Sequence, residues 1–270
     1  MHSKQAAVVI PIYKAQYSAY ELISIAQCFK VLKNYPVIFV KPNSLSVLPT
    51  VPPGAKFEII SFDDSFFADI NGYNKLMLSE GFYGSFSDYE FILIHQMDAF
   101  VFTDQLSYWC NQGYDYIGAP WISENVYTNF VRRIKERIKN YLYVRYNAKY
   151  KDGMPKIGKQ LENRVGNGGF SLRRAGLFAN YCKKFKPLAD KYIAMQHPSY
   201  NEDVFWSLEL NRKRKNVKVP GFNKSLHFAF ELYPDRAIEK TKGQLPFGCH
   251  AWDKEREFWQ PIFKKEGYDI

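Results

Sequence analysis

The sequence has few cysteines and no usual nucleotide-binding glycine signature. Cys28, Cys110, Cys182 and Cys249 are scattered through 270 residues without a CxxC pair, which argues against a structural zinc site or a disulfide framework. No apolar run approaches the ~18 residues of a membrane span, and no linker, low-complexity tract or repeat divides the chain. Because GxGxxG after the first strand and GxxxxGK[ST] are both missing, a nucleotide site would have to be of another kind.

The chain is also without a signal-peptide pattern, since its first residues lead directly into an apolar run. We therefore expect a cytoplasmic protein whose cysteines stay reduced. Aromatic residues make up 17% and charged residues 24% of the chain, a composition typical of a globular, enzyme-sized domain. The sequence predicts a single domain over residues 1–270.

The net charge of +10 favours an anionic partner. Between Val131 and Lys151, eight Lys and Arg residues accompany one Glu, and apolar residues recur at roughly helical spacing. This basic segment, 131–151, belongs to a predicted helical insertion at 128–151. It either lies on an anionic membrane surface at the inner face of the membrane or packs its apolar stripe on its own domain. Nucleic acid is a weaker alternative, because no recognised nucleic-acid motif accompanies the charge.

Strand-like and helix-like segments alternate in the first hundred residues. Predicted strands lie at 6–12, 36–40, 56–60 and 91–94, with helices at 18–33 and 71–80. This alternation predicts an α/β fold with a mostly parallel central sheet flanked by helices. Later segments predict helices around 105–111, 174–185 and 202–211, a short strand at 114–118, and an aromatic, loop-rich tail.

One acidic residue follows the most apolar of these strands. Asp98 comes directly after Phe91-Ile92-Leu93-Ile94-His95-Gln96-Met97. In open α/β sheets, ligands bind outside the carboxyl ends of the strands, and an ionised Asp beside an apolar core needs a cation or hydrogen-bond donors. Asp98 is therefore either a metal or phosphate contact, or only a turn or capping residue.

Three further features follow Asp98 in the chain. Gly166-Asn167-Gly168-Gly169 allows close backbone approaches that a side chain would block. Glu202 and Asp203 form an acidic pair at a predicted helix start, and His250 lies in an aromatic loop near the C-terminus.

This order of motifs resembles the GT-A-type inverting glycosyltransferases and a group of uncharacterised bacterial proteins with a glycosyltransferase-like domain. The resemblance spans roughly Val8 to Trp252. Gln96-Met97-Asp98 matches the metal-binding DxD motif in position, with Gln96 in place of its first acid. The resemblance implies that Asp98 and His250 bind Mn²⁺ or Mg²⁺, that Asp203 is the catalytic base, and that Glu202 contacts sugar hydroxyls.

Other roles are assigned more broadly. The resemblance implies a nucleotide-binding half at 1–104 and an acceptor-binding half at 105–270. The nucleotide contacts are expected to be Pro11, Tyr13, Asn74, Lys75, Gln96 and Asp98. The sugar contacts are expected to be Trp121, Gly168, Gly169 and Trp252, because aromatic faces suit sugar rings and the Gly-rich block shapes the pocket in the family.

We expect an inverting transfer from a UDP-linked sugar to a saccharide or glycolipid in surface polysaccharide synthesis. The phosphates of such a donor need a cation, and a general base is worth ~10²–10⁴-fold in rate. Two alternatives stay open: a metal-dependent phosphohydrolase or nucleotidyltransferase, and a non-catalytic carbohydrate-binding protein of the same fold.

Overall fold

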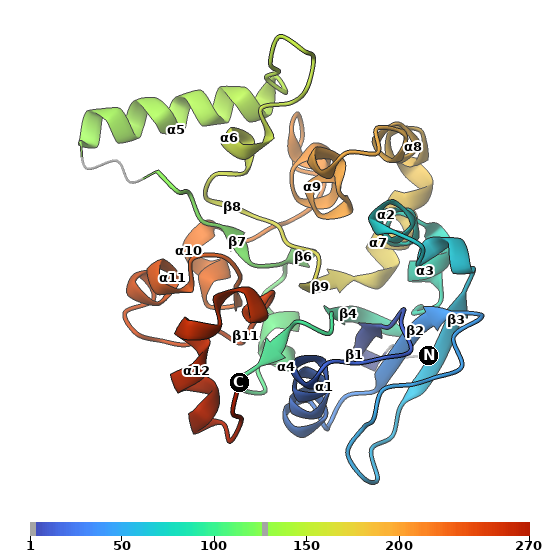
Figure 1. Ribbon diagram of the computed structural model, residues 1–270. Coiled ribbons are helices and arrows are strands. Elements are labelled where there is room, and N and C mark those ends of the chain that lie inside the picture. Colours follow the sequence, from blue (N-terminus) through green and yellow to red (C-terminus); the bar gives the residue numbers. More distant parts are fainter. Residues whose placement is uncertain (1–3, 126–128) are drawn as a thin grey trace.

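A six-stranded sheet forms the centre of the computed structural model, which describes residues 4–125 and 129–270 (Figure 1). The strand order is β3-β2-β1-β4-β9-β6. The strands are β1 (Lys4–Pro11), β2 (Val37–Pro42), β3 (Glu58–Phe62), β4 (Tyr89–His95), β6 (Tyr116–Ile117) and β9 (Phe170–Arg174). The first four run parallel to one another, and β9 runs antiparallel to both β4 and β6. The predicted, mostly parallel α/β sheet is therefore confirmed.

The two faces of this sheet bury alternate residues of each strand. Along β1, Ala6, Val8 and Ile10 pack with α1 and α4, whereas Ala7 and Val9 pack on the opposite face. The helices of the first face are α1 (Ala19–Val31) and α4 (Leu106–Cys110). Those of the second face are α2 (Ile70–Met77), α3 (Glu80–Gly84), α7 (Ala175–Lys184), α8 (Lys186–Ala194) and α9 (Glu202–Ser207). Because both faces are covered, the central strands are continuous apolar runs rather than alternating ones.

Helix boundaries follow local capping residues. Ser18 and Glu21 form a reciprocal capping box at the start of α1, which is a strong helix-start signal. The prediction of a single helix at 71–80 is wrong, because α2 ends at Met77 and a second helix, α3, begins at Glu80. The Ser79 side chain accepts from Phe82 N at 3.2 Å and caps that second helix, α3.

The C-terminal tail is more regular than its sequence predicted. It contains α10 (Phe222–Leu226), β10 (Ala229–Phe230), α11 (Pro234–Lys240), β11 (Gly248–Cys249) and α12 (Arg256–Lys265). Strands β10 and β11 join β5 (Phe100–Val101) in a second small sheet. Trp252, Trp259 and Phe263 pack against Phe100 and Phe102 in a separate core, so long-range aromatic burial orders a segment that lacks a clear local period.

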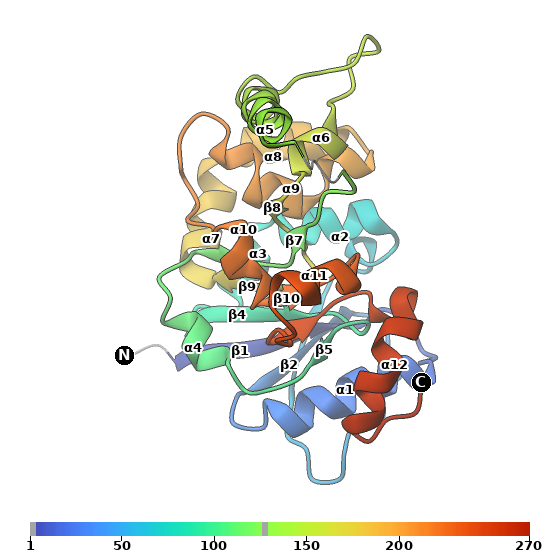
Figure 2. The same ribbon diagram turned by 90° about the vertical axis from the view of Figure 1, so that its left-hand side faces the viewer.

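The basic insertion projects at the edge of the molecule (Figures 1 and 2). It contains α5 (Phe130–Arg145), and α6 (Ile157–Leu161) follows it; β7 (Pro120–Trp121) precedes the insertion and β8 (Arg164–Val165) comes after α6. Thr128, at which the predicted insertion begins, lies outside the described residues. Within residues 4–125 and 129–270, no helix combines the length and apolar character needed to cross a bilayer.

Candidate active site

A cavity opens where the carboxyl ends of β1 and β4 lie side by side. The chain continues from β1 to β2 and β3 on one side, while β4 is followed by β9 and β6 on the other. Such a topological switch point is the usual ligand site of an open α/β sheet. The cavity has a volume of about 580 Å³. Its walls include Pro11, Tyr13, Lys14, Tyr20, Glu21, Asp69, Tyr73, Gln96, Asp98, Trp252 and Asp253.

Asp98 lines this cavity and contacts His250, which lies outside its described lining. His250 Nε2 lies 3.1 Å from Asp98 Oδ1 and 3.2 Å from Gln96 Oε1. The other ring nitrogen, Nδ1, lies 3.4 Å from an oxygen of Glu231, which follows β10. Burial opposes a charged His250, but the two carboxylates outweigh it and raise its pKa to about 10. Burial likewise opposes ionisation of Asp98, yet His250 lowers its pKa below the ordinary value.

The Gly-rich turn packs directly against this cluster. Asn167 has a left-handed backbone, with φ of 67°, and its Oδ1 accepts from Gly169 N at 2.9 Å. A Cβ on Gly169 would lie 2.0 Å from His250 Nε2 and 2.6 Å from Gln96 Oε1. The absence of that Cβ lets the turn approach both side chains, as the glycine pattern indicated. A Cβ on Gly168 would likewise lie 2.2 Å from Glu202 Oε1.

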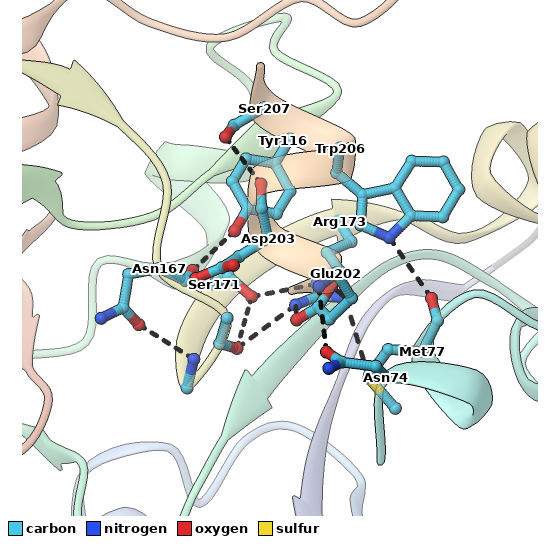
Figure 3. A network of polar contacts seen from close by, with 12 residues as sticks. Asn74, Met77, Tyr116, Asn167, Ser171, Arg173, Glu202, Asp203, Trp206 and Ser207 are labelled. Atoms are coloured by element: carbon cyan, nitrogen blue, oxygen red, sulfur yellow. Dashed lines mark hydrogen bonds and ion pairs between the residues drawn. The ribbon is translucent and has the colours of Figure 1, made fainter. Parts of the chain in front are cut away.

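A buried ion pair anchors the turn to α9 (Figure 3). Arg173 on β9 donates from its two terminal nitrogens to the carboxylate oxygens of Glu202, at 2.8 and 2.9 Å. The same guanidinium donates to Tyr83 Oη at 2.9 Å and to Gly168 O at 3.3 Å. The Arg173 side chain is 0% exposed and that of Glu202 is 4% exposed. Since both oxygens of Glu202 are engaged, its carboxylate is held in one position beside the turn.

Asp203 is the next residue on α9 and is not paired with Arg173. Its Oδ1 accepts from Val204 N at 2.7 Å, and the residue remains partly exposed. Burial, followed by the nearby charge of Glu202, raises its pKa to about 7, and Glu231 adds to the effect. A carboxylate that titrates near neutrality can both accept and release a proton under physiological conditions.

The remaining predicted contacts are more dispersed. Asn74 is buried, and its Oδ1 accepts from Glu202 N at 2.9 Å, so it supports the start of α9. Lys75 lines a different surface cavity, beside α8. Trp121 packs over Gly166, where a Cβ would lie 1.7 Å from its ring. Among the described residues, the lining of the switch-point cavity includes none of the predicted site residues Asn74, Lys75, Trp121, Gly168, Gly169, Glu202, Asp203 and His250.

Sequence reasoning missed several residues of the site. Glu231 carries the same signal as Asp98, a lone acid after an apolar segment, Phe228-Ala229-Phe230. Tyr73 lines the cavity near Gln96, and within the described chain its buried hydroxyl finds no partner at hydrogen-bond distance. Burial raises the pKa of Tyr73, so its hydroxyl stays protonated and can donate to a ligand. Arg173 was also missed, because nothing in Phe170-Ser171-Leu172-Arg173-Arg174 distinguishes it from the neighbouring Arg174.

The donor set at the cavity fits a divalent cation. In an octahedral site with bonds of ~2.1 Å, neighbouring ligand atoms lie ~3 Å apart. The distances from His250 Nε2 to Asp98 and Gln96 match this spacing, and a cation bound there would displace the proton from Nε2. Glu231 faces the other ring nitrogen, where ligating histidines usually meet a carboxylate. Over the described ranges no three His, Cys, Asp or Glu side chains form a ligand group, so an amide oxygen of Gln96 would be the third donor.

Comparisons with known proteins agree on the fold. A family model described as "Protein of unknown function (DUF5672)" matches residues 56–250. The galactosyltransferase LgtC, in complex with donor and acceptor sugar analogues, has a TM-score of 0.52 at 13% identity, over 90% of this chain and 86% of that chain. An active-site mutant of LgtC has a TM-score of 0.51 at 14% identity with the same coverage.

Mouse xyloside xylosyltransferase 1 in its apo form has a TM-score of 0.48 at 13% identity, over 91% of this chain and 97% of that chain. A search of curated proteins found no significant match. The likeness to LgtC confirms the predicted GT-A-like fold.

Proposed function

The chain belongs to the DUF5672 family, and from its site we propose that it is a glycosyltransferase with a nucleoside-diphosphate sugar as donor. The observation that carries this proposal is the position of Asp98, Gln96 and His250. Asp98 and Gln96 line the switch-point cavity, and both contact His250. The Gly168-Gly169 turn packs closely beside them because neither glycine has a Cβ. The GT-A-like fold shared with a galactosyltransferase supports the same class of reaction.

The cavity suits the nucleotide part of the donor. Tyr13 follows β1 and is 57% exposed, so its ring is available for a base to stack on. Pro11 and Tyr73 form neighbouring parts of the wall. We assign the base and ribose to the β1 end and the diphosphate to the β4 end, beside Asp98. A uridine nucleotide is the expected donor, as the resemblance implies.

Charge in the cavity supports a requirement for a cation. Among the described residues that line the cavity, Lys14 is the single lysine or arginine. Its Nζ forms an ion pair with Glu21 Oε1 at 2.8 Å. Asp69, Asp98 and Asp253 add further carboxylates to the wall. A diphosphate would meet an acidic surface here, and an unpaired like charge is costly to bring into a partly buried site. Mn²⁺ or Mg²⁺, held by Asp98, His250 and Gln96, would neutralise the leaving diphosphate when bound.

Asp203 is assigned as the base that takes the proton of the acceptor hydroxyl. Direct attack on the anomeric carbon would invert its configuration, and a base with a pKa of about 7 is suited to this step. Glu202 was expected to contact sugar hydroxyls, but Arg173 occupies both of its oxygens. We assign Glu202 as a positioning residue that fixes α9, and thereby Asp203, beside the Gly168 turn.

The acceptor is proposed to be a saccharide or glycolipid used in polysaccharide synthesis. Trp252 lines the cavity but is fully buried, and it donates from Nε1 to Ser24 Oγ at 3.1 Å. Its role is therefore to support the cavity wall.

A phosphohydrolase is less favoured, because such enzymes usually gather several carboxylates around one or two metals, and the described residues contain no such group.

Calorimetric titration with UDP, with and without Mn²⁺, tests the donor and metal assignments. We expect Mn²⁺ to strengthen UDP binding, and Asp98→Asn to remove this gain. Asp104→Asn is the matched control, because Asp104 is an exposed acid outside the cavity lining. Equal UDP binding by the parent with and without Mn²⁺ would reject the metal assignment. No binding of any nucleotide or nucleotide sugar would reject the donor site itself.

The transfer step is tested by incubating the protein with UDP-sugars and measuring UDP release. NMR of the released or transferred sugar then gives its anomeric configuration. Inversion supports Asp203 as the base, whereas retention would overturn that assignment and leave the donor site intact.

A further inference from the structure

Helix α5 packs on the molecule through the side that carries Asn140 and Val144. Asn140 donates to Glu162 Oε2 at 2.8 Å, and Arg145, the last residue of the helix, donates to Lys213 O at 2.6 Å. Val144 is the one residue of α5 that is buried, and it contacts α9 residues in a small cluster. The attachment of α5 therefore rests on a few polar contacts and a single apolar side chain.

The apolar side of the same helix is exposed. The exposed fractions are 63% for Phe130, 58% for Val131, 42% for Ile134, 56% for Ile138, 60% for Tyr141 and 45% for Leu142. With 3.6 residues per turn, these six side chains fall within about 120° of the helix circumference. We call them the α5 stripe. A helix that packs on its own domain would turn this stripe inward, so the expectation of internal packing is not met.

Basic residues border the α5 stripe. Helix α5 contains six Lys and Arg residues and one Glu. Lys135, Lys139 and Arg137 lie at its margins by helical period and are exposed. Figures 1 and 2 place the helix at the outer edge of the molecule, so both the stripe and the charges can meet a flat surface.

One margin of the stripe continues into a cavity between α5 and α10. This cavity has a volume of about 890 Å³ and is lined by Phe130, Ile134 and Tyr141 together with basic side chains. The lining also contains four cations, Arg133, Arg137, Arg164 and Lys240, and two carboxylates, Glu136 and Glu162. Its walls therefore offer apolar surface beside an excess of positive charge, which matches the chemistry of an acyl chain joined to a phosphate.

We infer that α5 is a membrane-surface helix that docks the protein on an anionic lipid bilayer. The α5 stripe enters the boundary between headgroups and acyl chains, and the bordering lysines and arginines contact lipid phosphates. This division of apolar and basic faces is what interfacial helices use. The inference is independent of the proposed sugar transfer, since no residue of the switch-point cavity takes part.

Two other occupants fit the surface less well. A second copy of the chain would bring two strongly basic helices together, and their like charges would repel. A nucleic acid would contact the lysines and arginines but would leave Val131, Ile138 and Leu142 uncovered, because phosphate contacts dominate such binding. An anionic bilayer satisfies both the charges and the stripe.

Vesicle flotation with the full chain tests this inference. We expect the protein to float with vesicles of equimolar phosphatidylcholine and phosphatidylglycerol and to stay behind with vesicles of phosphatidylcholine alone. Added salt should weaken the association, because the charges at the surface are screened. No association with the anionic vesicles, or equal association with both kinds, would overturn the inference.

Paired variants separate the stripe from its charges. We expect Ile138→Asn with Leu142→Asn, and separately Lys135→Glu with Lys139→Glu, each to weaken association about tenfold or more. The apolar control is Val47→Asn with Leu245→Asn, at residues 47% and 38% exposed on other parts of the molecule. The charge control is Lys183→Glu with Lys191→Glu, two exposed lysines on α7 and α8.

Thermal unfolding checks that each variant folds. Because the substituted residues are exposed, the substitutions should leave the melting temperature unchanged. Retained flotation in the folded stripe variant would overturn the inference. A dimer in size-exclusion chromatography that the stripe variant breaks would assign the surface to a second copy instead. Tight binding of single-stranded RNA that competes with vesicles would assign it to nucleic acid.

Discussion

Replacing Asp203 with Asn should slow the reaction and stabilise the protein at the same time. Asp203→Asn keeps the side-chain shape and an oxygen that can accept from Val204 N, but it removes the titratable carboxyl. If Asp203 is the base, turnover should fall by at least ~10²-fold, the lower end for general-base catalysis. In the parent, turnover should rise with pH through about 7, because the base must be ionised.

The effect on stability follows from the raised pKa. The pKa of Asp203 is about 7 in the folded protein, against an ordinary value of 3.8. Below pH 3.8 both the folded and the unfolded states are protonated, so the group contributes nothing. As the pH rises to about 7, the unfolded state ionises first and the folded state loses stability, by at most about 4 kcal/mol. Partial exposure of Asp203 makes the actual loss smaller.

Urea denaturation of the parent and Asp203→Asn at pH 5 and at pH 8 measures this difference. We expect the variant to exceed the parent by about 1–4 kcal/mol at pH 8 and by roughly 40% of that difference at pH 5, where the unfolded state is already mostly ionised. Asp190→Asn is the control, because Asp190 is an exposed carboxylate that pairs with Lys186 on the surface. A variant with the same stability difference at both pH values would refute the argument from burial. Unchanged turnover would refute the assignment as base.

Other predictions concern the network that holds the site. Arg173→Met should destabilise the protein by about 3–5 kcal/mol in chemical denaturation, because it leaves the carboxylate of Glu202 buried and unpaired. Adding Glu202→Met to that variant should recover much of the loss, and no recovery would contradict the buried-pair argument. Gly169→Ala should lower UDP binding and turnover, since its Cβ would overlap the histidine ring of the cavity, whereas Gly176→Ala, with nothing within 4 Å, should leave both unchanged. Tyr13→Ala should weaken UDP binding in calorimetry without lowering the melting temperature, because that ring is 57% exposed.

Local sequence was enough to predict much of the structure of residues 1–104. Each central strand buries a short apolar run, and the run before Asp98 ends at the sheet edge where the cavity lies. The glycine pattern also predicted a close approach, which Gly168 and Gly169 make. These features depend on residues near one another in the chain, so hydrophobic period and turn chemistry are sufficient to find them.

The contacts between site residues that are distant in the chain could not be predicted from local sequence. Gln96 and His250 meet across 154 positions, and Arg173 meets Glu202 across 29. The sequence could rank Glu202 and Asp203 only as an acidic pair at a helix start. The structure separates them, because one faces a buried guanidinium and the other does not.

The basic insertion illustrates the same division between sequence and structure. The sequence alone determined that α5 has an apolar stripe and a basic border, since both follow from helical period. It could not determine which side faces the molecule, because that depends on which distant residues offer contacts. Asn140, through its contact with Glu162, and the buried Val144 face the molecule, and the stripe on the outer side of the helix is left exposed. Composition and period determine what a segment can bury, and only tertiary packing decides what is actually buried.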